Sequence, residues 1–309
     1  MRSQTVSILE GNNFVVSDLR GDIEASPTDT LGLFNWDTRF LSRWRLTIDG
    51  KTLNSLSTDD LHYYAAQFFL VPGTGTIYSD AAMSVVRRRS VGDGFHEDIT
   101  VANHSPEQIN LVMRIDAAAD FADLFEVKDA LSKKGETYKH VDGDVLVLGY
   151  RRESYVRETR ISASAQEAQL DEDGITFNIH IEPHAEWTTC VDVTAILGAL
   201  PPTNNRAHDP HAQRSPMAVG LDDIVLAAPH LSSSWDELDR TYARSIVDLA
   251  ALRFFPRVLP GRAVPAAGLP WFMTIFGRDT LITAYQALPF SPGLADVDAT
   301  ANRLLSTYF

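Results

Sequence analysis

The dominant period of apolar and polar side chains is two from the start of the chain to about residue 195, with interruptions at turn signals. The pattern is clearest at the apolar positions Ile109, Leu111, Met113 and Ile115, and at Ile175, Phe177, Ile179 and Ile181. Successive side chains of a β-strand point to opposite faces, so this period predicts strands with one buried and one solvated face. Asp-Gly pairs supply the positive-φ positions of tight hairpin turns, and they occur at 49–50, 93–94, 142–143 and 173–174. Residues 1–197 are therefore predicted to be antiparallel strands of an all-β sandwich or barrel.

Residues 198–232 differ in composition, because they contain Pro201-Pro202, Asn204-Asn205, Pro210 and Pro216, and this is typical of a long connection between domains. Within them, Ile224-Val225-Leu226 is a candidate for one more short strand. The segment therefore predicts a domain boundary.

From Ser233 onward the apolar spacing becomes helical. Ser234 is the expected N-cap of a helix, whose apolar side chains at spacings of three and four are Trp235, Leu238, Tyr242, Ile246 and Leu249. A second helix is expected from about Arg278 to just before Pro289, and a third from about Ala295 to Phe309. Residues 233–309 thus form a predicted helical domain.

Charge and cysteine content exclude several classes of function. The chain has 309 residues and a formal net charge of −14, which disfavours nucleic acid and anionic membrane surfaces as partners. The single cysteine, Cys190, permits no intrachain disulfide, and we expect no Cys-based zinc site, no other metal and no cofactor. No apolar run resembles a signal peptide or a membrane span. We therefore expect a cytoplasmic protein.

The strongest local signal for chemistry is the segment GLPWFMTIFGRDTLI (268–282), where a Pro/Gly-rich loop meets a predicted helix. An aromatic face such as that of Trp271 can cover the apolar side of a sugar, while Arg278 and Asp279 can hydrogen-bond its hydroxyls. The alternative, which the residue types alone favour, is that Asp279 is an N-cap and Arg278 its surface neighbour. These three residues are the candidate substrate-binding site.

Other candidates carry weaker signals. His208 and His211 could bind a metal, but in a Pro-rich segment solvated histidines are the more frequent outcome. Arg87-Arg88-Arg89 cannot form one surface on a strand, since neighbouring side chains alternate faces. Cys190 is most simply interpreted as an apolar strand residue.

Three further segments resemble the N-terminal domain of bacterial glycogen debranching enzymes of the amylo-α-1,6-glucosidase type. They are NFVVSDLRGDI (13–23), GLFNWDTRFLS (32–42) and FADLFEV (121–127). Residues 268–282 resemble the opening of the catalytic (α/α)6 barrel of those enzymes. The resemblance implies a mainly β fold, an antiparallel sandwich, followed by the first helices of an incomplete (α/α)6 barrel. In the sandwich motifs we expect buried polar pairing and turn capping, not catalysis, from Asp18, Asp22, Asp37 and Arg39.

The length of the helical part departs from that family pattern. A twelve-helix barrel needs roughly 200 residues, whereas 309 − 231 = 78 follow Leu231. By resemblance, the catalytic acid and base lie beyond Phe309, so this chain contains no catalytic residue and is expected to be an inactive fragment of a glycoside hydrolase. Its helices would expose apolar faces and could drive self-association.

The resemblance implies branched α-glucan, either glycogen or a limit dextrin, as substrate, with Arg278 and Asp279 gripping the terminal glucose and Trp271 beside them. Two alternatives remain open. The chain could be a non-catalytic carbohydrate-binding or interaction module made only of the sandwich, or a non-functional reading frame. An exposed aromatic strip on the sandwich would favour the module.

Overall fold

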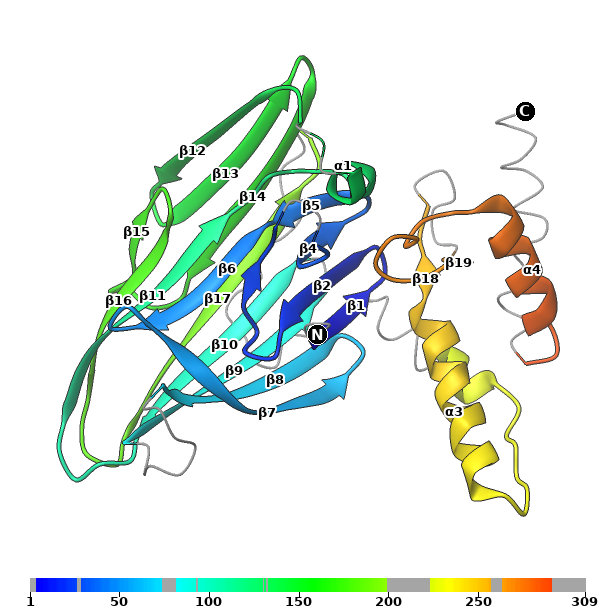
Figure 1. Ribbon diagram of the computed structural model, residues 1–309, viewed down its shortest axis with the longest axis horizontal. Coiled ribbons are helices and arrows are strands. Elements are labelled where there is room, and N and C mark those ends of the chain that lie inside the picture. Colours follow the sequence, from blue (N-terminus) through cyan, green and yellow to red (C-terminus); the bar gives the residue numbers. More distant parts are fainter. Residues whose placement is uncertain are drawn as a thin grey trace. The chain divides into compact units, whose positions relative to one another are not determined.

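The computed structural model describes residues 4–26, 29–73, 82–92, 94–129, 131, 133–198, 223–256 and 263–290. The chain divides into two compact units, one made of residues 1–9 and 13–212 and the other of residues 10–12 and 213–309. The first unit holds the antiparallel strands, and the second holds the longer helices (Figure 1). Most of the expected connection at 198–232 lies outside the described residues. The domain bounds 1–197, 198–232 and 233–309 therefore stay a prediction.

The predicted antiparallel β-structure is confirmed, since every strand pairing described in the first unit is antiparallel. The strands are β1 (Thr5–Glu10), β2 (Asn13–Asp18), β3 (Ile23–Glu24), β4 (Gly32–Asn35), β5 (Thr38–Leu41), β6 (Arg43–Ile48), β7 (Lys51–His62), β8 (Ala65–Pro72), β9 (Met83–Val91), β10 (Phe95–Asn103), β11 (Ile109–Ala118), β12 (Glu136–Asp142), β13 (Val145–Arg152), β14 (Tyr155–Ala163), β15 (Gln169–Asp171), β16 (Gly174–Ile181) and β17 (Glu186–Ile196). The one helix described between residues 4 and 198 is the short α1 (Leu124–Asp129).

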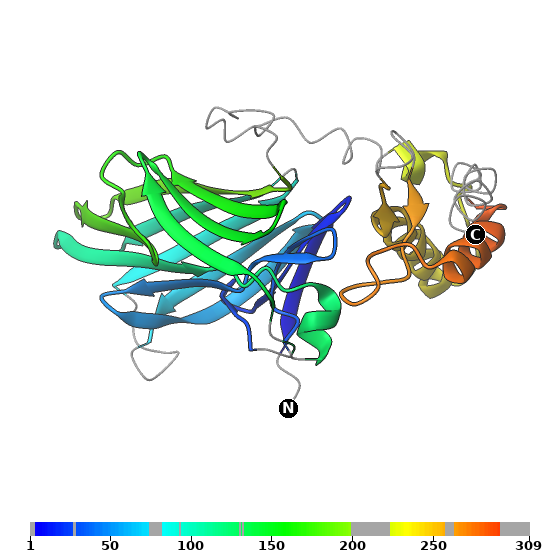
Figure 2. The ribbon, with the colours of Figure 1, turned by 90° about the horizontal axis from the view of Figure 1, so that it is seen from above.

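A long sheet folds over on itself to make the two layers visible in Figure 2. Its strand order is β12-β13-β14-β17-β10-β9-β8-β7-β6-β11-β16-β15, with β3 paired to β6. Trp44 of β6 packs edge-on against Phe95 of β10, with ring centroids 5.5 Å apart, and Phe177 of β16 meets Trp187 of β17 at the same distance. The core therefore lies between the β6–β11–β16 layer and the β9–β10–β17 layer.

A smaller sheet, in the order β1-β2-β4-β5, completes the first unit. Phe14 of β2 stacks on Phe34 of β4 at 4.7 Å between ring centroids, and both side chains are fully buried. Helix α1 lies beside this sheet, since Asp123, the residue before α1, forms an isolated antiparallel bridge with Thr38 of β5. Asp123 and Glu126 form a reciprocal capping box at the start of the helix. The Asp123 carboxylate accepts the Glu126 N–H at 2.8 Å, and the Glu126 carboxylate accepts the Asp123 N–H at 2.8 Å.

The Asp-Gly pairs form turns, but not all in the expected place. Asp49 and Gly50 both have positive φ, 50° and 72°, as predicted for a two-residue hairpin turn. In the β12–β13 hairpin Asp142 still pairs with Val145, so the turn begins one residue later, at Gly143. In the β15–β16 hairpin Asp171 pairs with Gly174, which makes Gly174 the first residue of the strand. Asp93 lies outside the described residues.

The second unit contains two longer helices, α3 (Asp236–Ala251) and α4 (Gly277–Ala287), and the two-stranded sheet of β18 (Arg253–Phe254) and β19 (Val264–Pro265). Helix α4 agrees with the expected second helix. The third expected helix, at 295–309, falls outside the described residues. The (α/α)6 barrel start is thus not confirmed. No helix in the described ranges has the length and apolar character needed to cross a membrane.

Two local expectations in this unit were wrong. Residues 223–227 are helical, so Ile224-Val225-Leu226 is not a strand. A helical turn satisfies its own backbone groups, whereas so short a strand needs a partner. The N-cap of α3 is Trp235 and not Ser234, without a capping side-chain hydrogen bond. The serine that bonds near this helix start is Ser233, one residue before the predicted Ser234. Its hydroxyl accepts the Trp235 N–H at 3.0 Å.

Candidate functional site

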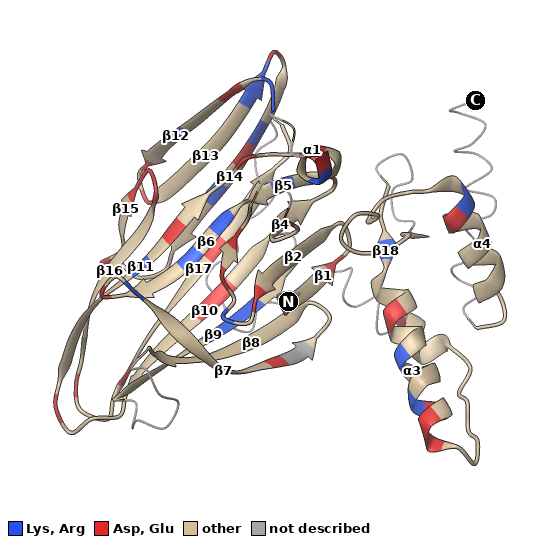
Figure 3. Cartoon of the chain, in the orientation of Figure 1, with Lys and Arg blue, Asp and Glu red and all other residues tan. Residues whose placement is uncertain are grey.

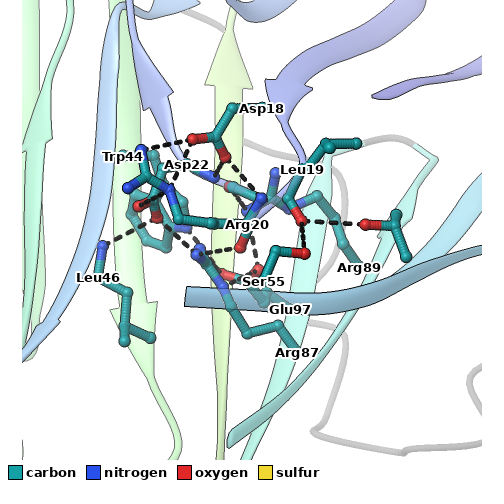
Figure 4. Close-up of polar contacts among 12 residues, drawn as sticks. Asp18, Leu19, Arg20, Asp22, Trp44, Leu46, Ser55, Arg87, Arg89 and Glu97 are labelled. Carbon is teal, nitrogen blue, oxygen red and sulfur yellow. Dashed lines mark hydrogen bonds and ion pairs between the residues drawn. The ribbon is translucent and has the colours of Figure 1, made fainter. Parts of the chain in front are cut away.

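The most concentrated group of charges lies inside the first unit. We call Asp22, Arg87, Arg89 and Glu97 the buried ionic cluster (Figure 4). Arg87 donates to Glu97 at 2.9 Å and to Asp22 at 2.6 Å, and Arg89 donates to Glu97 at 2.8 Å. Trp44 Nε1 donates to Glu97 Oε2 at 2.7 Å from the opposite layer. The cluster therefore joins β9 and β10 to β6.

Burial and mutual attraction set the ionisation of these groups. Burial alone would raise the pKa of Glu97, but the adjacent Arg87 and Arg89 guanidiniums outweigh it and hold that pKa below its usual value. Burial raises the pKa of Asp22 despite its bond to Arg87, and burial lowers the pKa of Arg89 to about 10.

Arg89 also lies against aromatic rings, with its guanidinium carbon 4.6 Å from the Phe95 ring centroid and 5.3 Å from that of Phe68. Because the side chains of Arg87, Arg89 and Glu97 are wholly buried, the cluster is structural and does not contact substrate. Arg87 and Arg89 point inward and Arg88 outward, as the alternation of faces required.

The sandwich motif residues behave as expected, with one exception. Asp18 caps a turn by accepting the N–H groups of Arg20 and Asp22 at 2.8 and 2.9 Å. The buried Arg39 guanidinium donates to both Asp120 carboxylate oxygens, and from Nη1 to the Asp29 carbonyl at 2.9 Å. The exception is Asp37, whose carboxylate makes no described hydrogen bond, and whose pKa is raised by burial and by the nearby Asp123.

The predicted sugar-binding residues lie in the second unit. Arg278 and Asp279 are the second and third residues of α4, and both are exposed. They are the blue and red bands on the first turn of α4 in Figure 3. Within the described residues, neither side chain forms a hydrogen bond or an ion pair. Both residues are exposed to solvent.

Trp271 lies within the loop that leads into α4. Gly268 and Phe272 close this loop, with the Phe272 N–H donating to the Gly268 carbonyl at 2.9 Å and the Gly268 N–H returning a bond at 3.2 Å. Gly268 has φ +144°, a conformation that L side chains rarely adopt. Trp271 itself is half-buried, and Phe272 beside it is exposed. The loop brings aromatic side chains into the segment just before the charged pair.

The alternative interpretation of Asp279 as an N-cap is wrong. The N-cap of α4 is Phe276, and no side chain caps this helix end. Asp279 sits in the first turn, where a carboxylate is favoured by the helix dipole. Its presence there has a structural benefit, but it does not cap the helix.

Sequence reasoning missed a polar group on the outer face of β10 and β17. His96 and Asp98 alternate on β10, and they face Asp192 and Cys190 of β17 in the antiparallel register. His96 Nδ1 lies 2.6 Å from Asp192 Oδ1, and His96 Nε2 lies 3.2 Å from Asp98 Oδ1. Hydrogen bonds to Asp192 and then to Asp98 raise the pKa of His96 to about 10.

Cys190 was expected to be an apolar strand residue, but it lies half-buried on this polar face. Its inward neighbours Thr189 and Val191 take the buried positions instead. The sequence signal that could have found this group is the spacing: one residue separates His96 from Asp98, and one separates Cys190 from Asp192. It identifies which residues share a face, but not which strand lies next to which.

These features define an antiparallel β-sandwich with a buried ionic cluster, followed by a helical unit with an exposed Arg-Asp pair. The family model described as the N-terminal domain of (some) glycogen debranching enzymes matches residues 8–192 of this sequence. The chain belongs to this family. The match covers the three motifs at 13–23, 32–42 and 121–127 that carried the resemblance.

Solved structures add more distant similarities. A provisionally assigned kojibiose phosphorylase from the human microbiome is 10% identical, with a TM-score of 0.42, over 81% of this chain and 36% of that protein. The Slr1438 protein of Synechocystis sp. PCC 6803 is 7% identical, with a TM-score of 0.42, over 64% of this chain and 97% of that one. This chain thus spans about a third of the length of the first. No curated protein matches the chain.

Proposed function

We propose that this chain is the N-terminal portion of a cytoplasmic glycogen-debranching α-1,6-glucosidase that acts on branched α-glucans. The observation that carries the proposal is family membership over residues 8–192, together with the exposed Arg278-Asp279 pair downstream of it. The single cysteine is consistent with a reducing compartment.

In this proposal the start of α4 binds the terminal glucose of a branch. The Asp279 carboxylate accepts hydrogen bonds from sugar hydroxyls, and the Arg278 guanidinium donates to hydroxyl oxygens. Bonds to charged groups are shorter and stronger than neutral ones, and neither side chain has to give up a described partner. Trp271 would place an aromatic face against the apolar side of the ring.

Hydrolysis needs two further groups. An inverting glycosidase requires a carboxylic acid at the leaving oxygen and a carboxylate about 6.5 to 9.5 Å away that activates water. We assign neither role to a residue of this chain and propose that both lie further along the full enzyme. The chain alone would then bind glucan without cleaving it.

The competing function, a carbohydrate-binding module made only of the sandwich, has less support. Large exposed aromatic side chains described in the sandwich are Phe125 on α1 and Tyr155 on β14, which lie on separate elements. The described part of the second unit exposes more of them, namely Trp235, Phe272, Tyr285 and Phe290. Exposed aromatic side chains for a glucan surface are therefore more numerous in the described part of the second unit.

The test is binding of a branched limit dextrin to the 309-residue chain by titration calorimetry, with an assay for released glucose. We expect measurable binding that Arg278→Ala and Asp279→Ala each weaken by about tenfold or more, since a hydrogen bond to a charged group contributes about 1.5–3 kcal/mol. Arg240→Ala is the matched control, because Arg240 is an exposed arginine on α3. Unchanged binding in both site variants would overturn the site, and robust glucose release would overturn the proposed absence of catalytic groups.

A further inference from the structure

We propose that His96, Asp98 and Cys190 form a binding site for a divalent transition metal, with Zn²⁺ as the best fit, on the outer face of β10 and β17. Their ligand atoms all lie within 4.8 Å of one another, and they are the one group of this kind found among the described residues. This site is independent of the glucan site proposed on α4.

Strand register creates the site. Asp98 lies directly opposite Cys190 in the β10–β17 ladder, and His96 lies opposite Asp192. Residues two apart on a strand share a face, so all four side chains point to the same side of the sheet. The inward-facing residues between them, Glu97 and Val191, are fully buried and hold both strands in place. Three ligands therefore project from a rigid pair of strands and not from a loop.

The hydrogen bonds of His96 identify which nitrogen would bind the metal. Nδ1 faces Asp192 at 2.6 Å, whereas Nε2 faces Asp98 at 3.2 Å. Histidines that bind metal usually donate the other ring N–H to a carboxylate, which fixes the ring and raises the basicity of the ligating nitrogen. Asp192 can take this role, which leaves Nε2 to ligate beside the Asp98 oxygen. The metal would take the place of the hydrogen bond between Nε2 and Asp98 Oδ1.

The distances suit a tetrahedral ion after small adjustments. Bonds of about 2.0–2.3 Å to zinc place ligand atoms roughly 3.3 to 3.8 Å apart. The Nε2–Oδ1 distance of 3.2 Å already agrees, and the remaining separations of up to 4.8 Å close through side-chain rotation. His96 and Asp98 are about 30% exposed, at 29% and 33%, so a water molecule can reach a fourth position.

The ligand types select the class of metal. A thiolate and an imidazole favour Zn²⁺ and its neighbours in the first transition row, whereas Mg²⁺ and Ca²⁺ require oxygen ligands. The sequence predicted no Cys-based zinc site and no other metal, and this proposal departs from that prediction. A mixed set of His, Asp and Cys ligands cannot be recognised from sequence spacing, because its members come from strands that are far apart in the sequence.

Cobalt(II) provides a direct test, because its bond to a thiolate gives a charge-transfer absorption in the near ultraviolet. The full chain is stripped with a chelator, kept reduced with a non-thiol reductant and titrated with Co²⁺. Cys190 is the only cysteine, so a thiolate band that saturates at one Co²⁺ per monomer and disappears on adding Zn²⁺ is the expected result. Histidines elsewhere in the chain cannot produce this band.

Variants separate the site from a lone thiol that captures cobalt. We expect His96→Gln and Asp98→Asn to abolish the band at one equivalent, and Asp192→Asn to weaken Co²⁺ binding by about 10- to 100-fold. His180→Gln is the matched control, since His180 of β16 has a similar pair of partners, Asn110 and Glu182, but belongs to no such three-ligand group.

The absence of a thiolate band in the unaltered chain would overturn the proposal. A band that persists in both His96→Gln and Asp98→Asn would do so as well, because cobalt would then be held by Cys190 without its neighbours. If His96→Gln does not fold, Asp98→Asn and Asp192→Asn decide by the same readout.

Discussion

Arg87 donates from Nε to Glu97 Oε1 across 2.9 Å, and both side chains are wholly buried. The two residues lie on adjacent strands, β9 and β10, and Glu97 also accepts a bond from Trp44 on β6. One carboxylate thus pairs with two arginines and links the two layers of the sandwich. Its removal leaves Arg87 with Asp22 alone and Arg89 without an acidic partner among the described residues.

The first prediction concerns this carboxylate. Glu97→Gln should lower the free energy of unfolding by about 3–5 kcal/mol, since breaking a buried ion pair leaves an uncompensated charge in the interior. Urea unfolding followed by circular dichroism measures the change. Glu186→Gln, an exposed glutamate on β17, should change stability by no more than about 0.5 kcal/mol. Equal effects of the two substitutions would contradict the structural role of Glu97.

Sequence alternation predicted the inward positions of this sandwich well where the residues are apolar. Ile175, Phe177, Ile179 and Ile181 are all buried on β16, as expected. At Arg87 and Arg89 the same rule separated the faces but did not reveal which face is buried. The answer depends on Asp22, Trp44 and Glu97, whose strands become neighbours only in the folded sheet, so local pattern could not supply it.

A second prediction tests the start of β16. Gly174 has φ +156°, and a Cβ atom there would lie 2.0 Å from the Ile115 carbonyl oxygen. Gly174→Ala should therefore destabilise the protein by backbone strain of about 1–3 kcal/mol and by a clash with β11 in addition. Gly143→Ala is the control, because Gly143 has φ +57° but no atom near the added methyl group. Thermal unfolding should show the larger loss for Gly174→Ala, and the reverse order would refute the clash.

The third prediction is a pH dependence in metal-free protein. The folded-state pKa of His96 is about 10, above its usual value of about 6.5. Protonated His96 therefore stabilises the fold fully below pH of about 6.5, and this stabilisation is lost as pH rises to about 10. The charged or titratable side chains around it are Asp98 on its own strand, Asp192 and Cys190 on β17, and Arg88 on β9.

Urea midpoints at pH 6, 8 and 10, as trial values spanning that window, test this expectation. The stability difference between the unaltered chain and His96→Gln should shrink steadily with rising pH. Ser90→Ala, directly opposite His96 on β9, should show a difference that does not change with pH. A constant difference for His96→Gln would mean that its charge does not contribute.

At the candidate sites, too, features that depend on local sequence were predicted, and features that depend on contacts between distant strands were not. The start of α4 was predicted from local signals, and the structure places Arg278 and Asp279 on its first turn. The group of His96, Asp98 and Cys190 was not found, because its members meet only through the β10–β17 register. Cap positions were the least accurate local feature, since Trp235 and Phe276 occupy N-caps without any side-chain bond.

The last prediction is self-association through the helical unit. On α3, Ile246 of the predicted apolar stripe is buried, whereas Trp235 and Leu238 remain 63% and 40% exposed. On α4, Ile282 and Tyr285 are 49% and 71% exposed, and at a spacing of three they share a face. Each such side chain gains about 1.5–3 kcal/mol when fully removed from water, and exposed apolar patches of this kind favour association.

Sedimentation velocity over a range of protein concentrations measures this association. We expect the unaltered chain to form dimers or larger species, and the double variant Ile282→Ser/Tyr285→Ser to shift the distribution toward monomer. Leu56→Ser on β7 is the control, because Leu56 is 52% exposed on the sandwich and should not alter the distribution. An unaltered chain that stays monomeric at all concentrations would contradict the prediction, and so would association that the double variant leaves unchanged.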